Sequence, residues 1–222
     1  MADRLTPTES FPTLRETPEE IAYELSAHEG ALWTGSRMTI GIWAFAFAAL
    51  GFAYFYLRSS NNANLWRPAH MTAPTGVGAA VLAFSLASAL LVGYGLWRFR
   101  SGSALDWQVA GWTGVLCTLI AVGLQIWQLT ELPFFPGRSG YSSCFVGWAG
   151  MNITLLLSGA YWLETLLARE LRLRRAVSED GGVVRSALPA VRLFRVNLEG
   201  CTYYWVFIAL VALFFWMLFY VV

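Results

Sequence analysis

Residues 200–222 read GCTYYWVFIALVALFFWMLFYVV and contain neither a charged residue nor a histidine. An α-helix of about 20 apolar residues is long enough to cross the ~30 Å hydrocarbon core of a bilayer. A strand crosses lipid only within a closed barrel, whose sequence alternates between apolar and polar residues, and this stretch shows no such alternation. The stretch is therefore predicted to be a transmembrane helix.

Four more segments have the same character, so the whole chain is predicted to be an all-α, multi-pass membrane protein. Only 13% of its 222 residues are charged and 57% are hydrophobic, whereas a soluble protein carries roughly 25% charged residues. The membrane domain is predicted to occupy residues 34–222 as a bundle of five transmembrane helices. These helices are expected at about 38–57, 75–97, 107–130, 142–167 and 200–222.

Residues 1–33 form an acidic segment in front of the membrane domain. The first 30 residues hold seven acids and two arginines, and they lack the apolar core of a secretory signal. The stretch TPEEIAYELSAHEG at 17–30 begins with a capping box, in which Thr17 caps the helix and Glu20 completes the motif. We expect a short amphipathic helix here, ending at Gly30.

The arginines are distributed unevenly, and every basic residue besides the histidines is an arginine. Loops 98–106 and 164–199 carry nine arginines, whereas loops 58–74 and 131–141 carry three. Because cytoplasmic loops are enriched in Arg and Lys, the N-terminus is predicted to lie in the cytoplasm. An ordinary orienting role is the simpler explanation for the cluster that follows the fourth helix, and contact with anionic lipid headgroups is the alternative. That cluster consists of Arg169, Arg172, Arg174 and Arg175.

Residues that carry out chemistry are scarce in the predicted helices. His28 and His70 both lie outside them, so a haem held by two histidines or a copper site is not expected in this chain. Cys117, Cys144 and Cys201 lie in three different segments and are expected to behave as small apolar side chains. We expect no catalytic, cofactor-binding or metal-binding residue.

Three amides are the main polar groups inside the predicted helices. Gln125 and Gln128 are three residues apart and share a helix face, and Asn152 lies in the next helix. Such groups usually form hydrogen bonds with a neighbouring helix in a membrane. A proton path more often uses Asp, Glu or His. Contact between helices is the favoured interpretation, and a transport path is the alternative.

Glu164 and Glu199 are acids at the edge of the predicted membrane segments. Glu199 precedes the first turns of the last helix, where the helix dipole favours a negative charge and an arginine of the same loop could hold it. The stretch from 197 to 216, NLEGCTYYWVFIALVALFFW, resembles the final helix of the haem-copper oxidase subunit III family, which includes cytochrome c oxidase subunit III. The family pattern is matched at Glu199, Tyr204, Trp205 and Phe207. The family's His and Asp positions hold Val206 and Ala209 here.

Other segments resemble the same family in the same order. The stretch AALGFAYFYLRSSNNANLWRP is similar to the end of the family's Glu-containing helix, but the family's acid falls near Trp43. LQIWQLTEL and SGYSSCFVGWAGMNITLLLSG are similar to two further family motifs, and in the second a family histidine is replaced by Asn152. The signature residues in these two segments are Gln125, Gln128, Tyr141, Gly150 and Asn152.

The resemblance implies a divergent five-helix subunit of a respiratory haem-copper terminal oxidase, a cytochrome c oxidase, in a bacterial inner membrane. Such a subunit is non-catalytic. It stabilises catalytic subunit I and supports proton uptake and aerobic electron transport. Haem and copper belong to the catalytic partner, and bound phospholipid is expected. Further oxidase subunits and membrane lipids are expected partners, and nucleic acid is not.

Small residues at fourfold spacing make the first two predicted helices candidates for the face that packs on the catalytic partner. These residues are Ala44, Ala48, Ser85, Ala89 and Gly93. One alternative is a subunit III-like partner of a nitric oxide reductase or a quinol oxidase. An alternative of another class is a small transporter or channel that uses the three amides.

Overall fold

The computed structural model describes residues 18–61, 66–68, 71–179 and 189–221, with the side chains of Pro18 and of 175–179 left out. These residues form five helices and no strand. All five helices are long and apolar enough to cross a membrane, which confirms the predicted all-α class with five spans. The helices are α1 (Pro18–Ser59), α2 (Thr75–Arg100), α3 (Ala104–Thr130), α4 (Gly140–Glu179) and α5 (Pro189–Tyr220).

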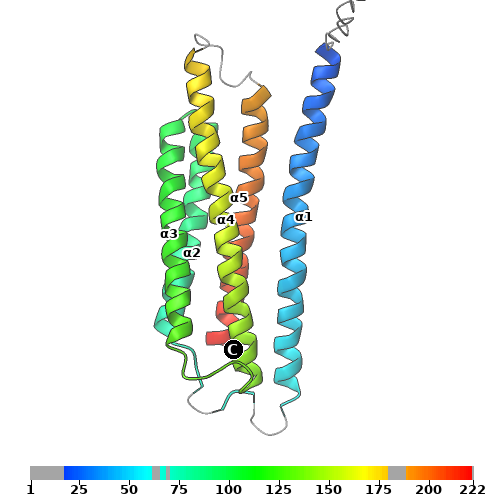
Figure 1. The fold of residues 1–222 in the computed structure, drawn as a ribbon. Helices are drawn as coiled ribbons and strands as arrows, with labels where there is room; N and C mark the ends of the chain where they lie inside the picture. Colours follow the sequence, from blue (N-terminus) through cyan, green and yellow to red (C-terminus); the bar gives the residue numbers. More distant parts are fainter. Residues whose placement is uncertain (1–17, 62–65, 69–70, 180–188, 222) are drawn as a thin grey trace, which may run out of the picture.

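The helices stand side by side along one direction, with α1 on one side of α4 and α5 and the α2–α3 pair on the other (Figure 1). A tight turn joins α2 to α3, and Gly102 in this turn has a φ of 86°, which glycine adopts without steric cost. Inside the pair, Ser88 Oγ donates to the Gly114 carbonyl oxygen at 2.8 Å and lies 2.8 Å from Thr118 Oγ1. These bonds hold α2 against α3 near the middle of both helices.

An aromatic cluster fills the core at the end of the bundle where α5 finishes. The ring centroid of Phe219 lies 5.4 Å from that of Tyr54, 5.8 Å from Tyr141, 5.3 Å from Phe145 and 5.5 Å from Trp148. Most of these pairs meet edge to face, the geometry that aromatic rings favour. The cluster joins α1, α4 and α5, because its rings come from all three.

Three helices extend well beyond the predicted membrane-spanning segments. α1 runs without a break through Gly30, so the prediction that a short helix ends there is wrong. A helical glycine costs only about 1 kcal/mol, and the neighbouring residues are good helix formers. α4 continues to Glu179 and α5 already begins at Pro189. Their charged ends lie outside the apolar windows but remain helical, supported by pairs such as Glu170–Arg174, four residues apart.

The boundary predicted near residue 33 falls within the continuous helix α1. An ion pair between Arg192 and Glu29, at 3.0 Å, ties the polar part of α1 to the beginning of α5. Thr17, the predicted helix cap, and His70 lie outside the described residues. The polar beginning of α1 is thus linked to α5 by this ion pair, while most of its side chains between 19 and 30 are exposed.

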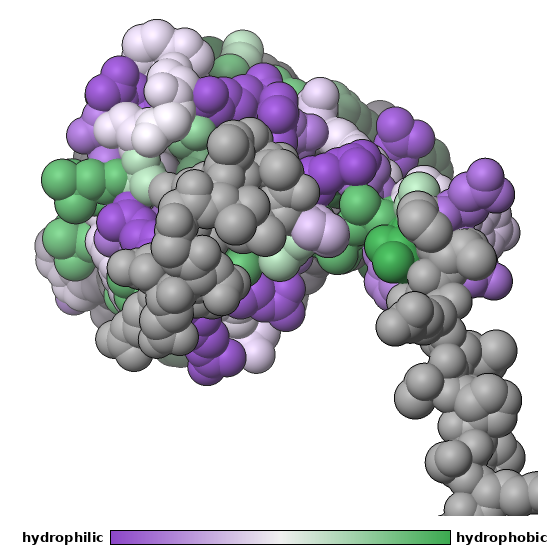
Figure 2. Space-filling view, turned by 90° about the horizontal axis from the view of Figure 1, so that it is seen from above, coloured by the Kyte–Doolittle hydropathy of each residue, from purple (hydrophilic) through white to green (hydrophobic). Residues whose placement is uncertain are grey.

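The two ends of the bundle differ in charge. One end, which we call the arginine-rich end, contains the first residues of α1 and α5 and the last residues of α2 and α4. Hydrophilic residues gather on it when it is viewed from above (Figure 2). Its described arginines are Arg98, Arg100, Arg169, Arg172, Arg174, Arg192 and Arg195. The opposite end carries Arg58, Arg67 and Arg138.

Candidate functional site

A line of polar side chains, which we call the amide chain, runs through the interior toward the end opposite the arginine-rich end. Asn152 Nδ2 donates to Gln125 Oε1 at 3.2 Å, and Gln125 Nε2 donates to Gln128 Oε1 at 2.8 Å. Gln128 Nε2 donates to the Tyr220 hydroxyl at 2.6 Å and to the Pro74 carbonyl oxygen at 3.0 Å. The amide chain thus connects α3 with α4, α5 and the residue that precedes α2.

Helix geometry and a glycine, Gly78, position the members of the amide chain. Gln125 and Gln128 share a face of α3, and both are fully buried, as is Asn152. Tyr220 reaches Gln128 because it packs directly on Gly78 of α2. A Cβ atom added to Gly78 would overlap the Tyr220 ring. Glycine at this position therefore permits the last contact of the amide chain.

The hydrogen bonds of the amide chain indicate its role. Its amide donors are directed at partners within the bundle, so the group links four segments through hydrogen bonds that lipid cannot supply. Asn152 Oδ1 accepts no hydrogen bond from the described residues. Tyr220 is the member of the amide chain that can titrate. The observed bonds are those of the favoured interpretation, contact between helices.

We expect Gln128 and Tyr220 to be energetically coupled. In a double-mutant cycle with Gln128→Leu and Tyr220→Phe, the coupling should be about 0.6 kcal/mol and at most about 1.7 kcal/mol, the range of such bonds in membranes. Unfolding by SDS in mixed micelles, followed through labelling of the buried thiol of Cys144, provides the measurement. Thr113→Val is the control for Gln128→Leu, because Thr113 bonds only its own helix. A coupling no larger than that of the control pair would contradict the bond.

Glu199 lies at the arginine-rich end, between α2 and α5. Arg100 Nη2 of α2 lies 2.7 Å from Glu199 Oε1, and Arg195 Nε of α5 lies 3.2 Å from the same oxygen. The sequence suggested an arginine of the preceding loop as a partner, and Arg195 is such a residue, now within α5. Arg100 comes from a different helix. The pair therefore ties the beginning of α5 to the end of α2.

Tyr204 and Trp205 fix α5 against α4. The Tyr204 hydroxyl lies 2.7 Å from Ser158 Oγ, and Trp205 is fully buried. Both rings pack over Gly159, where any larger residue would meet them. These two signature residues therefore lie at the contact between α4 and α5, five and six residues after Glu199 along α5.

The other signature residues lie apart from each other. Phe207 is half-buried against Phe47 of α1, with ring centroids 6.4 Å apart. Tyr141 is buried, donates its hydroxyl to the Phe219 carbonyl oxygen at 3.3 Å, and lies under the Arg67 guanidinium. Gly150 lies on an open face of α4, with no atom within 4 Å of a Cβ added there. Phe207 and Tyr141 contribute to packing, whereas a Cβ at Gly150 would touch no neighbouring side chain of the described residues.

The small-residue rows of the first two helices have different surroundings. Ser85 is fully buried and donates to the Val81 carbonyl oxygen of its own helix. Ala44 and Ala48 line an apolar groove of about 470 Å³ between α1 and α5, together with Phe207. The row on α1 is thus open on the surface of the bundle, whereas part of the row on α2 is used within it.

Sequence reasoning missed a buried acid, Glu170 of α4. Its side chain is fully buried, pairs with Arg174 Nε at 2.6 Å and accepts a hydrogen bond from Gln108 Nε2 of α3. Helix periodicity could have revealed it, because Glu170 continues the inward series of Leu163 and Leu167. This acid links α3 to α4 at the arginine-rich end, as the amide chain does at the other end.

A cleft of about 460 Å³ opens between α1, α4 and α5 at the arginine-rich end. Of the four arginines proposed for lipid contact, Arg169 and Arg172 line this cleft and Arg174 is paired with Glu170. The side chain of Arg175 lies outside the described part of the chain. Cations above apolar walls suit an anionic group attached to a hydrocarbon chain. The remaining lining residues are His28, Leu32, Leu173, Ala190, Leu193, Phe194 and Asn197.

The cysteines are free thiols, with Cys144 and Cys201 buried and Cys117 half-buried. In the residues described, no three His, Cys, Asp or Glu side chains come together as metal ligands would.

No protein-family model matches this sequence, and a search of curated proteins finds no similar one. The resemblance to the subunit III family therefore rests on the residues quoted from the sequence.

Proposed function

We propose that this chain is a non-catalytic, subunit III-like accessory subunit of a haem-copper terminal oxidase, and that it stabilises the catalytic subunit in the membrane. The observation that carries the proposal is the role of the α5 signature. Glu199, Tyr204 and Trp205 all tie α5 to its neighbours. The part of the family pattern that this sequence retains is therefore the part that builds a stable bundle.

The replaced positions support the same role. Val206 is exposed and Ala209 is half-buried, where the family has His and Asp. Neither side chain can take up or release a proton. Redox chemistry and proton uptake then belong to the partner, which would hold the haem and copper, and this chain contributes a rigid, apolar surface beside it.

The charge pattern and the cleft support a proposed orientation in the membrane and a bound lipid. We place the arginine-rich end at the cytoplasmic face of a bacterial plasma membrane, following the positive-inside rule. A bound phospholipid at the cleft would set its headgroup near Arg169 and Arg172 and its acyl chains along the apolar walls. A lipid held there would fill the space between α1 and the rest of the bundle.

Purification of the tagged full chain from its native membranes in a mild detergent tests the proposal. We expect a haem-bearing chain to co-purify, visible in the reduced-minus-oxidised absorption spectrum. We also expect that the oxidase purified without this chain loses activity sooner during turnover. Full activity, lifetime and assembly of the oxidase without this chain would sink the proposal.

The same material distinguishes the alternatives. The haem type and the electron donor of a co-purified complex separate a cytochrome c oxidase from a quinol oxidase or a nitric oxide reductase. A colourless homo-oligomer that carries solute flux in vesicles would instead support a transporter or channel and overturn the proposed function.

A further inference from the structure

A buried carbonyl oxygen at the inner end of the amide chain has no donor. Asn152 is fully buried, and its Oδ1 atom meets no hydrogen-bond partner among the described residues. It lies within the membrane span that begins at Gly140, about 18 Å along α4 from that residue. Lipid offers no donor at this depth, and buried polar groups are almost always bonded to protein or to ordered water.

The hydrogen bonds of the amide chain fix which atom of Asn152 is left open. The Pro74 carbonyl oxygen can only accept, so the atom of Gln128 that faces it is Nε2. Gln128 Oε1 then accepts from Gln125 Nε2, and Gln125 Oε1 accepts from Asn152 Nδ2. A half-turn of the Asn152 amide would set two carbonyl oxygens against each other. The open atom is therefore an acceptor, and its ligand has to donate a hydrogen bond.

Trp148 supplies the complementary group, a donor without an acceptor. Its indole Nε1–H is buried and reaches no acceptor among the described residues. Trp148 precedes Asn152 by four residues, so the two are neighbours on one face of α4, with Cβ atoms about 5–6 Å apart. The Asn152 side chain leans toward the beginning of α4, over the turn that holds Trp148. One of these neighbours needs a donor and the other needs an acceptor, yet they do not bond each other.

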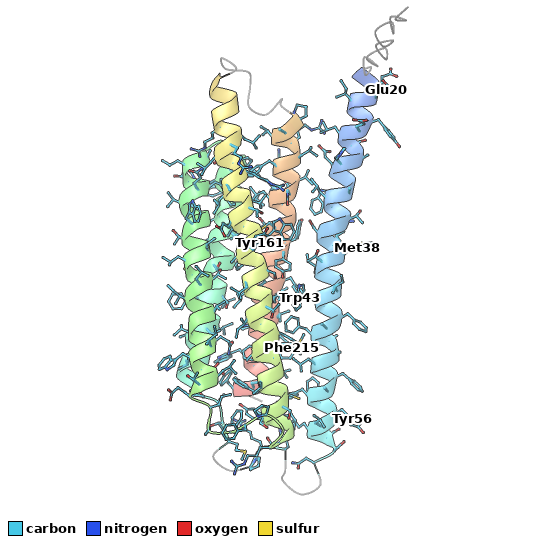
Figure 3. All side chains as sticks on the ribbon, in the orientation of Figure 1. Glu20, Met38, Trp43, Tyr56, Tyr161 and Phe215 are labelled. Atoms are coloured by element: carbon cyan, nitrogen blue, oxygen red, sulfur yellow. The ribbon has the colours of Figure 1, made fainter. Side chains whose placement is uncertain are left out.

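Packing holds the indole ring of Trp148 inside the bundle. The ring stacks on that of Phe215 of α5, with centroids 6.3 Å apart, and its centroid lies 5.5 Å from that of Phe219. Phe215 lies among the helices, in the half of the bundle farther from the arginine-rich end (Figure 3). Because Trp148 is 2% exposed, its nitrogen lies away from bulk water, and an acceptor has to come to it.

The other buried atoms without a partner do not form such a pair. Within the described part of the chain they are tryptophan or arginine nitrogens, which are donors like that of Trp148. Trp107, for example, lies in the first turn of α3 at the arginine-rich end, far from Asn152. Trp148 is the donor of this group that shares a face of α4 with the open acceptor. The two residues together suit a molecule that both donates and accepts.

We propose that Asn152 and Trp148 bind one buried water molecule inside the membrane span. The water donates a hydrogen to Asn152 Oδ1 and accepts the Trp148 indole N–H through a lone pair. Ordered waters bridge buried polar groups that stand too far apart to bond directly. This water extends the amide chain by one turn of α4. The inference rests on α4 and the amide chain, and it holds whether or not the protein belongs to an oxidase.

Solid-state NMR of the full chain in lipid bilayers tests this site. The chain carries isotope-labelled nitrogen throughout, and magnetisation transfer from water protons is measured at each side-chain N–H with a short mixing time. We expect transfer to the Trp148 indole. We expect none to the indole of Trp107, which is also fully buried and unpaired but lies far from the open acceptor. Trp148→Phe, which keeps an aromatic ring and removes the N–H, assigns the signal.

Two variants each remove one side of the site, and the other side provides the measurement. Asn152→Leu should abolish the transfer from water to the Trp148 indole. Trp148→Phe should abolish the transfer from water to the Asn152 amide protons. Unchanged indole signals of Trp107 and Trp205 show that a variant is folded. If Asn152→Leu fails this check, Trp148→Phe carries the test.

Several outcomes would overturn the proposal. One is the absence of transfer to Trp148, and another is transfer to Trp107 that is equally strong. A scalar coupling across a hydrogen bond from the Trp148 indole to the Asn152 carbonyl would show that the two groups meet directly. Equal transfer to Gln125 and Gln128 would indicate a wetted path along the amide chain, as a transporter or channel needs, instead of one bound water.

Discussion

Trp205→Ala is expected to lower the free energy of unfolding by about 3–5 kcal/mol, the range for removal of a large buried aromatic side chain. Trp205 is fully buried at the contact between α4 and α5, where it packs over Gly159. Lipid cannot fill the resulting space from outside. Because membrane helices associate through packing rather than through hydrophobic transfer, the lost contacts would weaken this pair of helices directly.

Trp112→Ala is the matched control for this substitution. Trp112 is 47% exposed on α3, so removal of its side chain should change stability by no more than about 0.5 kcal/mol. Both variants can be compared by SDS unfolding with labelling of Cys144, which is 4% exposed in the folded chain. Equal losses in the two variants would mean that Trp205 does not hold α4 and α5 together.

The five membrane-spanning helices could be predicted because each contains an apolar stretch of sequence long enough to cross the lipid bilayer. The beginnings of α1 and α5 could not, since the same criterion stops at the first charged residues. Those residues also make contacts with other helices, which an apolar stretch does not reveal. Glu29, for example, pairs with Arg192 of α5, which is distant in the sequence.

The candidate site shows the same division. That Gln125 and Gln128 lie on one face follows from their spacing alone. Their partners Tyr220 and Pro74 come from other segments and depend on how the helices pack. From the sequence, Glu199 is expected to be stabilised by the helix dipole or by an arginine of the preceding loop. The structure adds a second partner, Arg100, which is 99 residues away in the sequence. Residue spacing predicts which face a side chain lies on, and only packing determines what that face meets.

Gly95→Leu and Gly93→Leu should have opposite effects although the two residues are neighbours on α2. A Cβ atom at Gly95 would lie 2.8 Å from Cε3 of Trp107, which is fully buried. Overpacking of this kind should cost about 1–3 kcal/mol. Gly93 has no atom within 4 Å of such a Cβ, so its replacement should stabilise the helix by about 0.5–1 kcal/mol.

The comparison separates local from tertiary causes, since both variants change the helix propensity of α2 by the same amount. A loss only in Gly95→Leu means that the α2–α3 pair, closed by the Gly102 turn and the Ser88 bonds, depends on the close approach of backbone and indole at Gly95. SDS unfolding of the full chain measures both. Equal gains would show that Trp107 moves aside freely, and the tight packing of α2 on α3 would then have another origin.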